Sequence, residues 1–143
     1  MPGRETRPGK VYLQTCMPDH PVMAALIAGD REGFLVQETS DRKARSLPPF
    51  GRLAALIVSG HDEAAALGLA RDLARTAPRG GGIEVLGPAP APLSLLRNRY
   101  RFRLLLKAAR GVRVQAPVRA WLARVKIPRS LRVQVDIDPY SFL

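Results

Sequence analysis

Four arginines alternate with other residues along one short stretch of the sequence. They are Arg97, Arg99, Arg101 and Arg103, in the segment LRNRYRFRLLL. Alternate residues of a β-strand point to the same face, so a strand here would place the four charges in one row. Guanidinium groups bind phosphate well, and a row of cations is suited to a nucleic-acid backbone. The simpler alternative is a solvated sheet face that binds nothing.

The distribution of charge favours a polyanionic partner. The 143-residue chain has a net charge of +11 and a pI of about 11.2. No acidic residue occurs between Glu84 and Asp136, a window that holds twelve lysines and arginines. The rest of the chain is therefore nearly neutral. An arginine-rich composition that reflects a GC-rich genome would explain the total charge, but not its segregation into one half, so the pattern indicates nucleic-acid binding.

The sequence offers little for catalysis or metal binding. It has no GxxxxGK[ST] loop and no recognisable acid–base motif, which disfavours a small enzyme. Cys16 is the only cysteine, which excludes an internal disulfide and, beside only His20 and His61, argues against a structural zinc. Asp136 and Asp138 share a strand face and suggest a metal site, but a turn-and-cap role is the favoured interpretation. We therefore expect no metal.

Targeting signals are also missing from the sequence. The segment MPGRETRPGK is basic but has no apolar core of a secretory signal. No apolar run approaches the roughly 18–20 residues that span a bilayer. A cytoplasmic location without membrane contact is therefore expected.

The elements that position the arginines follow from hydrophobic periodicity. From residue 51 onward, the pattern predicts a β-α-β-β-α-β order, an α+β fold of the split β-α-β or ferredoxin-like class. Two helices would cover one face of a four-stranded, mainly antiparallel sheet and leave the other face open. The predicted elements are a strand over Leu53–Ser59, a helix capped by Asp62, a short strand over Ile83–Leu86 followed by a proline-rich loop, a longest strand over Tyr100–Ala108, a helix from about Ala116 to Pro128, and a strand over Leu131–Ile137.

Alternation assigns the side chains to the two faces. Tyr100, Phe102, Leu104 and Leu106 would face the helices, which favours core packing over base stacking. Trp121 lies on an apolar helix stripe and is also predicted to be core. The opposite face would carry Gln134 and the predicted nucleic-acid contacts. These contacts are Arg97, Arg99, Arg101, Arg103, Lys107 and Arg132.

The first fifty residues predict a strand and two helices. A short strand is expected over Gly9–Thr15. A helix should follow, with Asp19 as its cap, Pro21 in the first turn and Gly29 at its end. Asp30 should open a second helix that reaches about Ser46, before the linker LPPFG.

Several segments resemble the PriA family of replication restart helicases (primosomal protein N-prime). They are GRETRPGKVYLQT, LPPFGRLA, VLGPAPAPLSLLRNRYRFRLLLK and the terminal VDIDPYSFL, and the resemblance covers nearly the whole chain. It implies a C-terminal fragment or a truncated reading frame. Residues 1–28 would be a remnant of the second helicase lobe, residues 29–50 a helical linker, and residues 51–143 a C-terminal DNA-binding domain.

The resemblance also implies a function. The family consists of superfamily 2 DNA helicases that move 3′ to 5′ and reload the replicative helicase at stalled forks. ATP, magnesium and zinc serve the family, but the Walker motifs and zinc-binding cysteines are missing here. We therefore expect no cofactor in this chain and no ATPase activity from it alone. Arg4 would be the remnant of an arginine finger.

The expected partners are forked or single-stranded DNA, single-strand-binding protein and primosome proteins. The family's last domain resembles a small-subunit ribosomal protein, which leaves a free-standing RNA-binding module as the alternative. The segment GRETRPGKVYLQT favours the helicase family, because a ribosomal protein has no use for a helicase motif.

Overall fold

The computed structural model describes residues 9–139, and the chain divides into two compact units. The first unit ends at Ser40 and the second begins at Asp41. The division at residues 28 and 50 that the family resemblance implies stays a prediction. Arg4 lies outside the described residues.

The first unit contains helix α1 (Pro21–Ala28) and most of helix α2 (Arg31–Ala44). The N-cap of α1 is His20, whose Nδ1 accepts a 3.2 Å hydrogen bond from the backbone N–H of Val22. The prediction that Asp19 caps this helix was wrong, because His20 has the extended backbone of a cap and an acceptor in reach. Gly29, at φ 67°, ends α1 as predicted.

Asp30 precedes α2 and caps it, as predicted. Its Oδ1 accepts a 2.9 Å hydrogen bond from the N–H of Gly33. The helix ends at Ala44 rather than at Ser46. The predicted strand over Gly9–Thr15 was wrong: these residues form no strand, and no described strand pairs with them. A β-rich pattern becomes a strand only when a neighbouring strand supplies hydrogen bonds.

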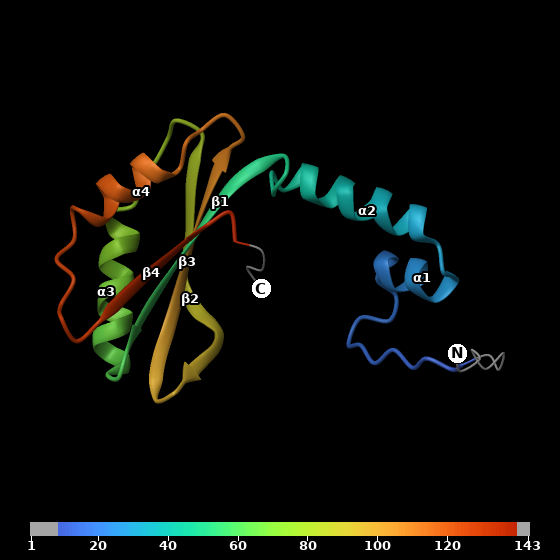
Figure 1. Cartoon of the computed structure of the whole chain (residues 1–143), viewed down its shortest axis with the longest axis horizontal. Helices are drawn as coiled ribbons and strands as arrows, with labels where there is room; N and C mark the ends of the chain where they lie inside the picture. Colours follow the sequence, from blue (N-terminus) through green and yellow to red (C-terminus); the bar gives the residue numbers. More distant parts are fainter. Residues whose placement is uncertain (1–8, 140–143) are drawn as a thin grey trace, which may run out of the picture. The chain divides into compact units, whose positions relative to one another are not determined.

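The second unit has the β-α-β-β-α-β order (Figure 1). Its sheet has the strand order β2-β3-β1-β4, and every neighbouring pair is antiparallel. The α+β prediction is therefore confirmed, while the ferredoxin-like assignment stays a prediction. The elements are β1 (Gly51–Gly60), α3 (Glu63–Arg75), β2 (Ile83–Leu96), β3 (Arg99–Ala109), α4 (Gln115–Leu122) and β4 (Arg132–Ile137).

Strand β2 differs from the prediction of a short strand followed by a loop. It continues to Leu96 and, with 14 residues, is longer than the 11-residue β3. The pairing with β3 shifts between Leu86 and Ala89 and again between Pro90 and Leu95. Prolines lack a backbone N–H, but an edge strand tolerates them where that N–H would face away from its neighbour. The proline-rich segment is therefore part of an irregular edge strand rather than a loop.

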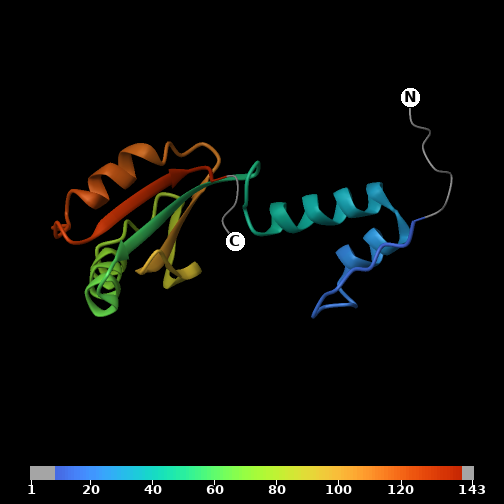
Figure 2. The same ribbon diagram turned by 60° about the horizontal axis from the view of Figure 1, so that its bottom comes forward.

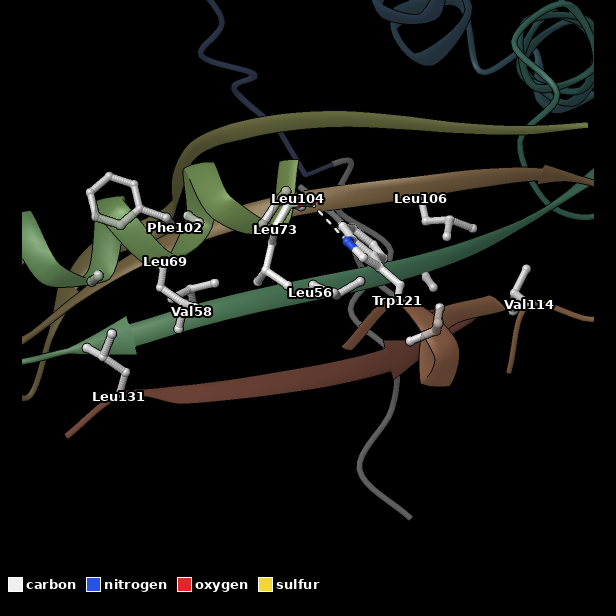
Figure 3. Packing of buried hydrophobic residues seen from close by; sticks show 14 of the residues in the cluster. Leu56, Val58, Leu69, Leu73, Phe102, Leu104, Leu106, Val114, Trp121 and Leu131 are labelled. Atoms are coloured by element: carbon white, nitrogen blue, oxygen red, sulfur yellow. Dashed lines mark hydrogen bonds between the residues drawn. The ribbon is translucent and has the colours of Figure 1, made fainter. Parts of the chain in front are cut away.

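The core lies between the sheet and the two helices, α3 and α4, which cover one face (Figures 1 and 3). Asp62 caps α3 by accepting a 2.9 Å hydrogen bond from the N–H of Ala65, as predicted. Trp121 is only 1% exposed, which confirms it as a core residue. The buried residues include Leu56, Val58, Leu69, Leu73, Phe102, Leu104, Leu106, Val114, Val118 and Leu131.

Candidate nucleic-acid interface

The pairing register places the predicted contact residues on the sheet face opposite the helices. Phe102, Leu104 and Leu106 are buried in the core, so the residues between them point to the open face. Arg101 and Arg103 are paired with Ser59 and Ile57 of β1. On the other side of β1, Arg132 is also paired with Ser59. Arg101 and Arg132 therefore flank one residue, about 10 Å apart across two strand spacings.

The open face is not uniformly basic, because its Lys107 end also carries carboxylates. The Nζ of Lys107 lies 3.6 Å from the Oε2 of Glu84 on β2. Asp136 occupies the same end of the face on β4, opposite Ala55. Lys107 was predicted as a phosphate contact, and that role stays a prediction. Its ion pair makes it the weakest candidate of the set.

Asp138 is engaged at this same end of the sheet. Its Oδ2 lies 2.6 Å from the Nη2 of Arg52, and its Oδ1 accepts a 3.2 Å hydrogen bond from the N–H of Leu53. The backbone N–H of Asp138 donates to the carbonyl oxygen of Leu53 at 2.8 Å. These contacts agree with a turn-and-cap role. Within residues 9–139, no three metal-ligating side chains of the His, Cys, Asp or Glu type form a group.

Arg101 also makes a contact within the fold. Its Nη1 donates a 3.2 Å hydrogen bond to the carbonyl oxygen of Pro92, in the irregular part of β2. This contact holds the proline-rich segment against the open face. Replacing Arg101 would therefore disturb β2 as well as remove a charge, and its side chain is a poor choice for an isolated test of binding.

Arg99, another arginine of the row, has a side-chain donor without a hydrogen-bond partner among the described residues. Its side chain is partly buried, and its Nη1 is shielded from solvent with no acceptor among the residues that the structure describes. A buried donor left unpaired costs about 1–3 kcal/mol, and more when the group is charged. Because Nη1 is shielded, a phosphate would reach it only if the guanidinium turned outward, and the hydrogen bond formed there would satisfy a donor that lacks a partner in this structure.

The β2–β3 turn presents Arg97 next to Arg99. Arg97 and Asn98 both have positive φ angles, 49° and 57°, as a tight hairpin turn requires. The Nδ1 of His61, directly after β1, donates a 2.8 Å hydrogen bond to the carbonyl oxygen of Asn98. This contact ties the turn to the end of β1. Sequence reasoning missed His61, because nothing in the pattern brings it to a turn 37 residues away.

These contacts divide the cations of the open face into two groups. At one end, Lys107 lies near the carboxylate of Glu84. At the other end, Arg97, Arg99 and Arg132 have no carboxylate partner among residues 9–139. We call this second group, together with Arg101, the basic end of the open face.

Comparison with known proteins identifies the family. Residues 43–140 match the model of the primosomal protein N C-terminal domain. The chain belongs to the PriA family. The replication restart protein PriA of Rickettsia conorii is 39% identical over 140 residues, which is 98% of this chain and 22% of that protein. The corresponding protein of Synechocystis is 35% identical, over 97% of this chain and 17% of its own length.

A more distant PriA relative matches over the same extent. The Bacillus subtilis protein is 28% identical, over 99% of this chain and 18% of its own length. The chain thus spans about a fifth of the length of the PriA proteins that it matches. Each of these relatives is named a replication restart protein. In the part of the chain that the structure describes, no helix is both long and apolar enough to span a membrane.

Proposed function

We propose that this chain is a DNA-binding C-terminal region of a replication restart helicase, and that the basic end of the open face contacts the phosphate backbone. Membership of the PriA family supports the replication restart part of the proposal. The lack of a carboxylate partner for Arg97, Arg99 and Arg132 among residues 9–139 is the observation that carries the DNA-binding part.

The chemistry is electrostatic and independent of base identity. Phosphate oxygens accept hydrogen bonds from Arg97, Arg99 and Arg132, and each contact releases condensed counterions. Phe102 is buried, so it offers no stacking platform, and the interface reads charge and shape rather than sequence. Forked DNA and single-stranded DNA are the substrates that the proposal favours, since a restart protein acts where duplex and single strands meet.

The family's ATP hydrolysis and zinc binding are not proposed for this chain. ATP hydrolysis, with its magnesium ion, and zinc binding require motifs that this sequence does not contain. We therefore expect the chain to bind DNA without turnover, in the cytoplasm. Single-strand-binding protein and primosome proteins are its proposed protein partners.

The test compares two variants that remove charge from different ends of the same face. In the Arg97→Gln/Arg99→Gln variant, two cations without carboxylate partners are lost. In the Lys107→Gln variant, a cation that already has a carboxylate partner is lost. Binding of a fluorescent forked DNA is measured by anisotropy across a salt series, and circular dichroism checks the fold.

We expect the double variant to bind more weakly, with a log–log salt slope shallower by about 1.4–1.8 for two contacts. Lys107→Gln should leave the slope within about 0.3 of the parent value. An unchanged slope in a folded Arg97/Arg99 variant would contradict the proposal. Stronger binding to a structured RNA than to any DNA would instead favour the ribosomal-protein-like alternative.

A further inference from the structure

We infer that the nucleic-acid track continues beyond the open face, around the β4 edge of the sheet, onto the loop between α4 and β4. Three cations define this extension, which we call the edge track: Arg124, Lys126 and Arg129. The inference rests on the proposed function, because it extends the footprint of the same DNA. It assigns the extension to a phosphodiester backbone.

The chain path makes the edge track continuous with the basic end. Helix α4 lies on the helix-covered face, whereas Arg132 of β4 lies on the open face opposite Ser59. The loop between them therefore leads from the helix layer to the first residue of the edge strand, where Leu131 still packs in the core and Arg132 points to the open face. Figures 1 and 2 show this loop, coloured orange to red, turning at the end of α4 and leading to the start of β4. Strand β4 is the edge strand, so no further strand covers this side of it.

Burial fixes which loop residues face solvent. Leu131 is 6% exposed and packs in the core, and it anchors the end of the loop. Arg124, Lys126 and Arg129 are all exposed. None of the three has an ion pair or a side-chain hydrogen bond with another residue in 9–139. With Arg132, they give the edge of the sheet four exposed cations over nine residues of sequence, without an intervening carboxylate.

Neither the helix dipole nor a membrane surface accounts for the whole edge track. Cations near the end of α4 interact favourably with the helix dipole, but this effect fades within the last turn. Arg129 lies well beyond that turn, which ends at Leu122. Binding to a membrane surface would call for several exposed apolar residues, and Ile127, at 38% exposed, is the one large exposed apolar residue that residues 115–139 present. A long polyanion whose contacts are mainly ionic fits better.

The test uses the whole chain and oligothymidines of two lengths, about six and about sixteen nucleotides. The short oligonucleotide is long enough to contact only the basic end, whereas the long one also reaches the edge track. The test variant is Arg124→Gln/Lys126→Gln/Arg129→Gln. The matched control is Arg45→Gln/Arg71→Gln/Arg79→Gln, which removes three exposed arginines from other elements of the second unit.

We expect the test variant to bind the short oligonucleotide like the parent chain. With the long one, its salt slope should be shallower by about 2, because three single-strand contacts are lost. The control variant should lose less than half of that. Equal losses in both variants, or no loss in the test variant, would overturn the inference while leaving the proposed function intact.

Two further outcomes separate the possible failures. If the test variant keeps its DNA binding but loses binding to a labelled polyglutamate peptide, the edge track belongs to an acidic protein and the inference is overturned. If the parent chain binds neither oligothymidine nor forked DNA, the proposed function fails together with the inference. Circular dichroism of each variant is required to match the parent before binding is compared.

Discussion

The Nε1 of Trp121 donates a 2.9 Å hydrogen bond to the carbonyl oxygen of Leu73, so a single side chain of α4 reaches across to α3 (Figure 3). The ring is 1% exposed and is the largest fully buried side chain of the described residues. Leu73 lies in the last turn of α3, where helix carbonyls lack partners within the helix. The indole therefore fills the space between the helices and also satisfies a backbone acceptor.

Replacing Trp121 separates these two contributions. Trp121→Ala should lower the free energy of unfolding by about 3–5 kcal/mol, because it removes a large buried ring. Trp121→Phe keeps much of the packing but removes one of the two donors to the Leu73 carbonyl, which keeps the 3.2 Å hydrogen bond from the Thr76 hydroxyl, and should cost about 1 kcal/mol. Urea unfolding followed by circular dichroism gives both values. A near-zero shift of the midpoint in the alanine variant would contradict the core assignment.

Gly87 should be intolerant of a side chain. Its φ is +103°, and a Cβ built there would lie 2.7 Å from the carbonyl oxygen of Arg103. Gly87→Ala should therefore destabilise the second unit by about 1–3 kcal/mol, through backbone strain and loss of the close β2–β3 approach. Gly111→Ala is the control, since nothing lies within 4 Å of its Cβ position. Similar melting temperatures for the two variants would argue against this geometry.

The contacts of Asp138 should contribute modestly to stability. The ion pair with Arg52 is about one-third exposed on both sides, so solvent screening makes it worth less than a buried pair. An alanine at this position would also lose the hydrogen bond from the N–H of Leu53. It would be strained by the φ of +49° at residue 138. Asp138→Ala should cost about 1–2 kcal/mol in chemical unfolding. Asp138→Asn should cost less, since asparagine tolerates positive φ and keeps an acceptor; a larger cost for Asn than for Ala would contradict this account.

The second unit should fold without the first. A chain that begins at Asp41 keeps every strand of the sheet and both helices of the core. It loses eight exposed large apolar residues: Val11, Tyr12, Leu13, Met17, Leu26, Ile27, Leu35 and Val36. We expect the same cooperative melting transition as in the full chain, and less self-association in light scattering. Loss of cooperativity would show that the sheet depends on residues before Asp41.

The sequence predicted best those features that depend on neighbouring residues. The Asp62 cap, the alternation of β3 and the apolar stripe around Trp121 are local patterns, and the structure confirms each. The extent of β2 was missed because prolines read as loop signals unless the strand is known to lie at an edge. Aspartate is a far commoner capping residue than histidine, so the pattern favours Asp19 and gives no signal for His20.

The composition of the open face could be predicted only in part. Alternation identified which side chains share the open face. It could not show that Lys107 meets Glu84, that Arg101 holds Pro92, or that Arg99 is left with an unpaired donor. These differences depend on the pairing register between strands that are distant in sequence, and on side-chain reach across it. Single-sequence patterns do not carry that information.

The central position of β1 has a consequence for how the chain acquires its structure during synthesis. Strand β1 pairs with β3 and β4, and both come from the C-terminal third of the sequence. Its buried Leu56 and Val58 therefore emerge from the ribosome long before the strands that flank them. Such distant pairings are slow to form, and they leave apolar surface exposed in the meantime. We therefore expect the nascent chain to be most prone to aggregation before its final strand has been translated.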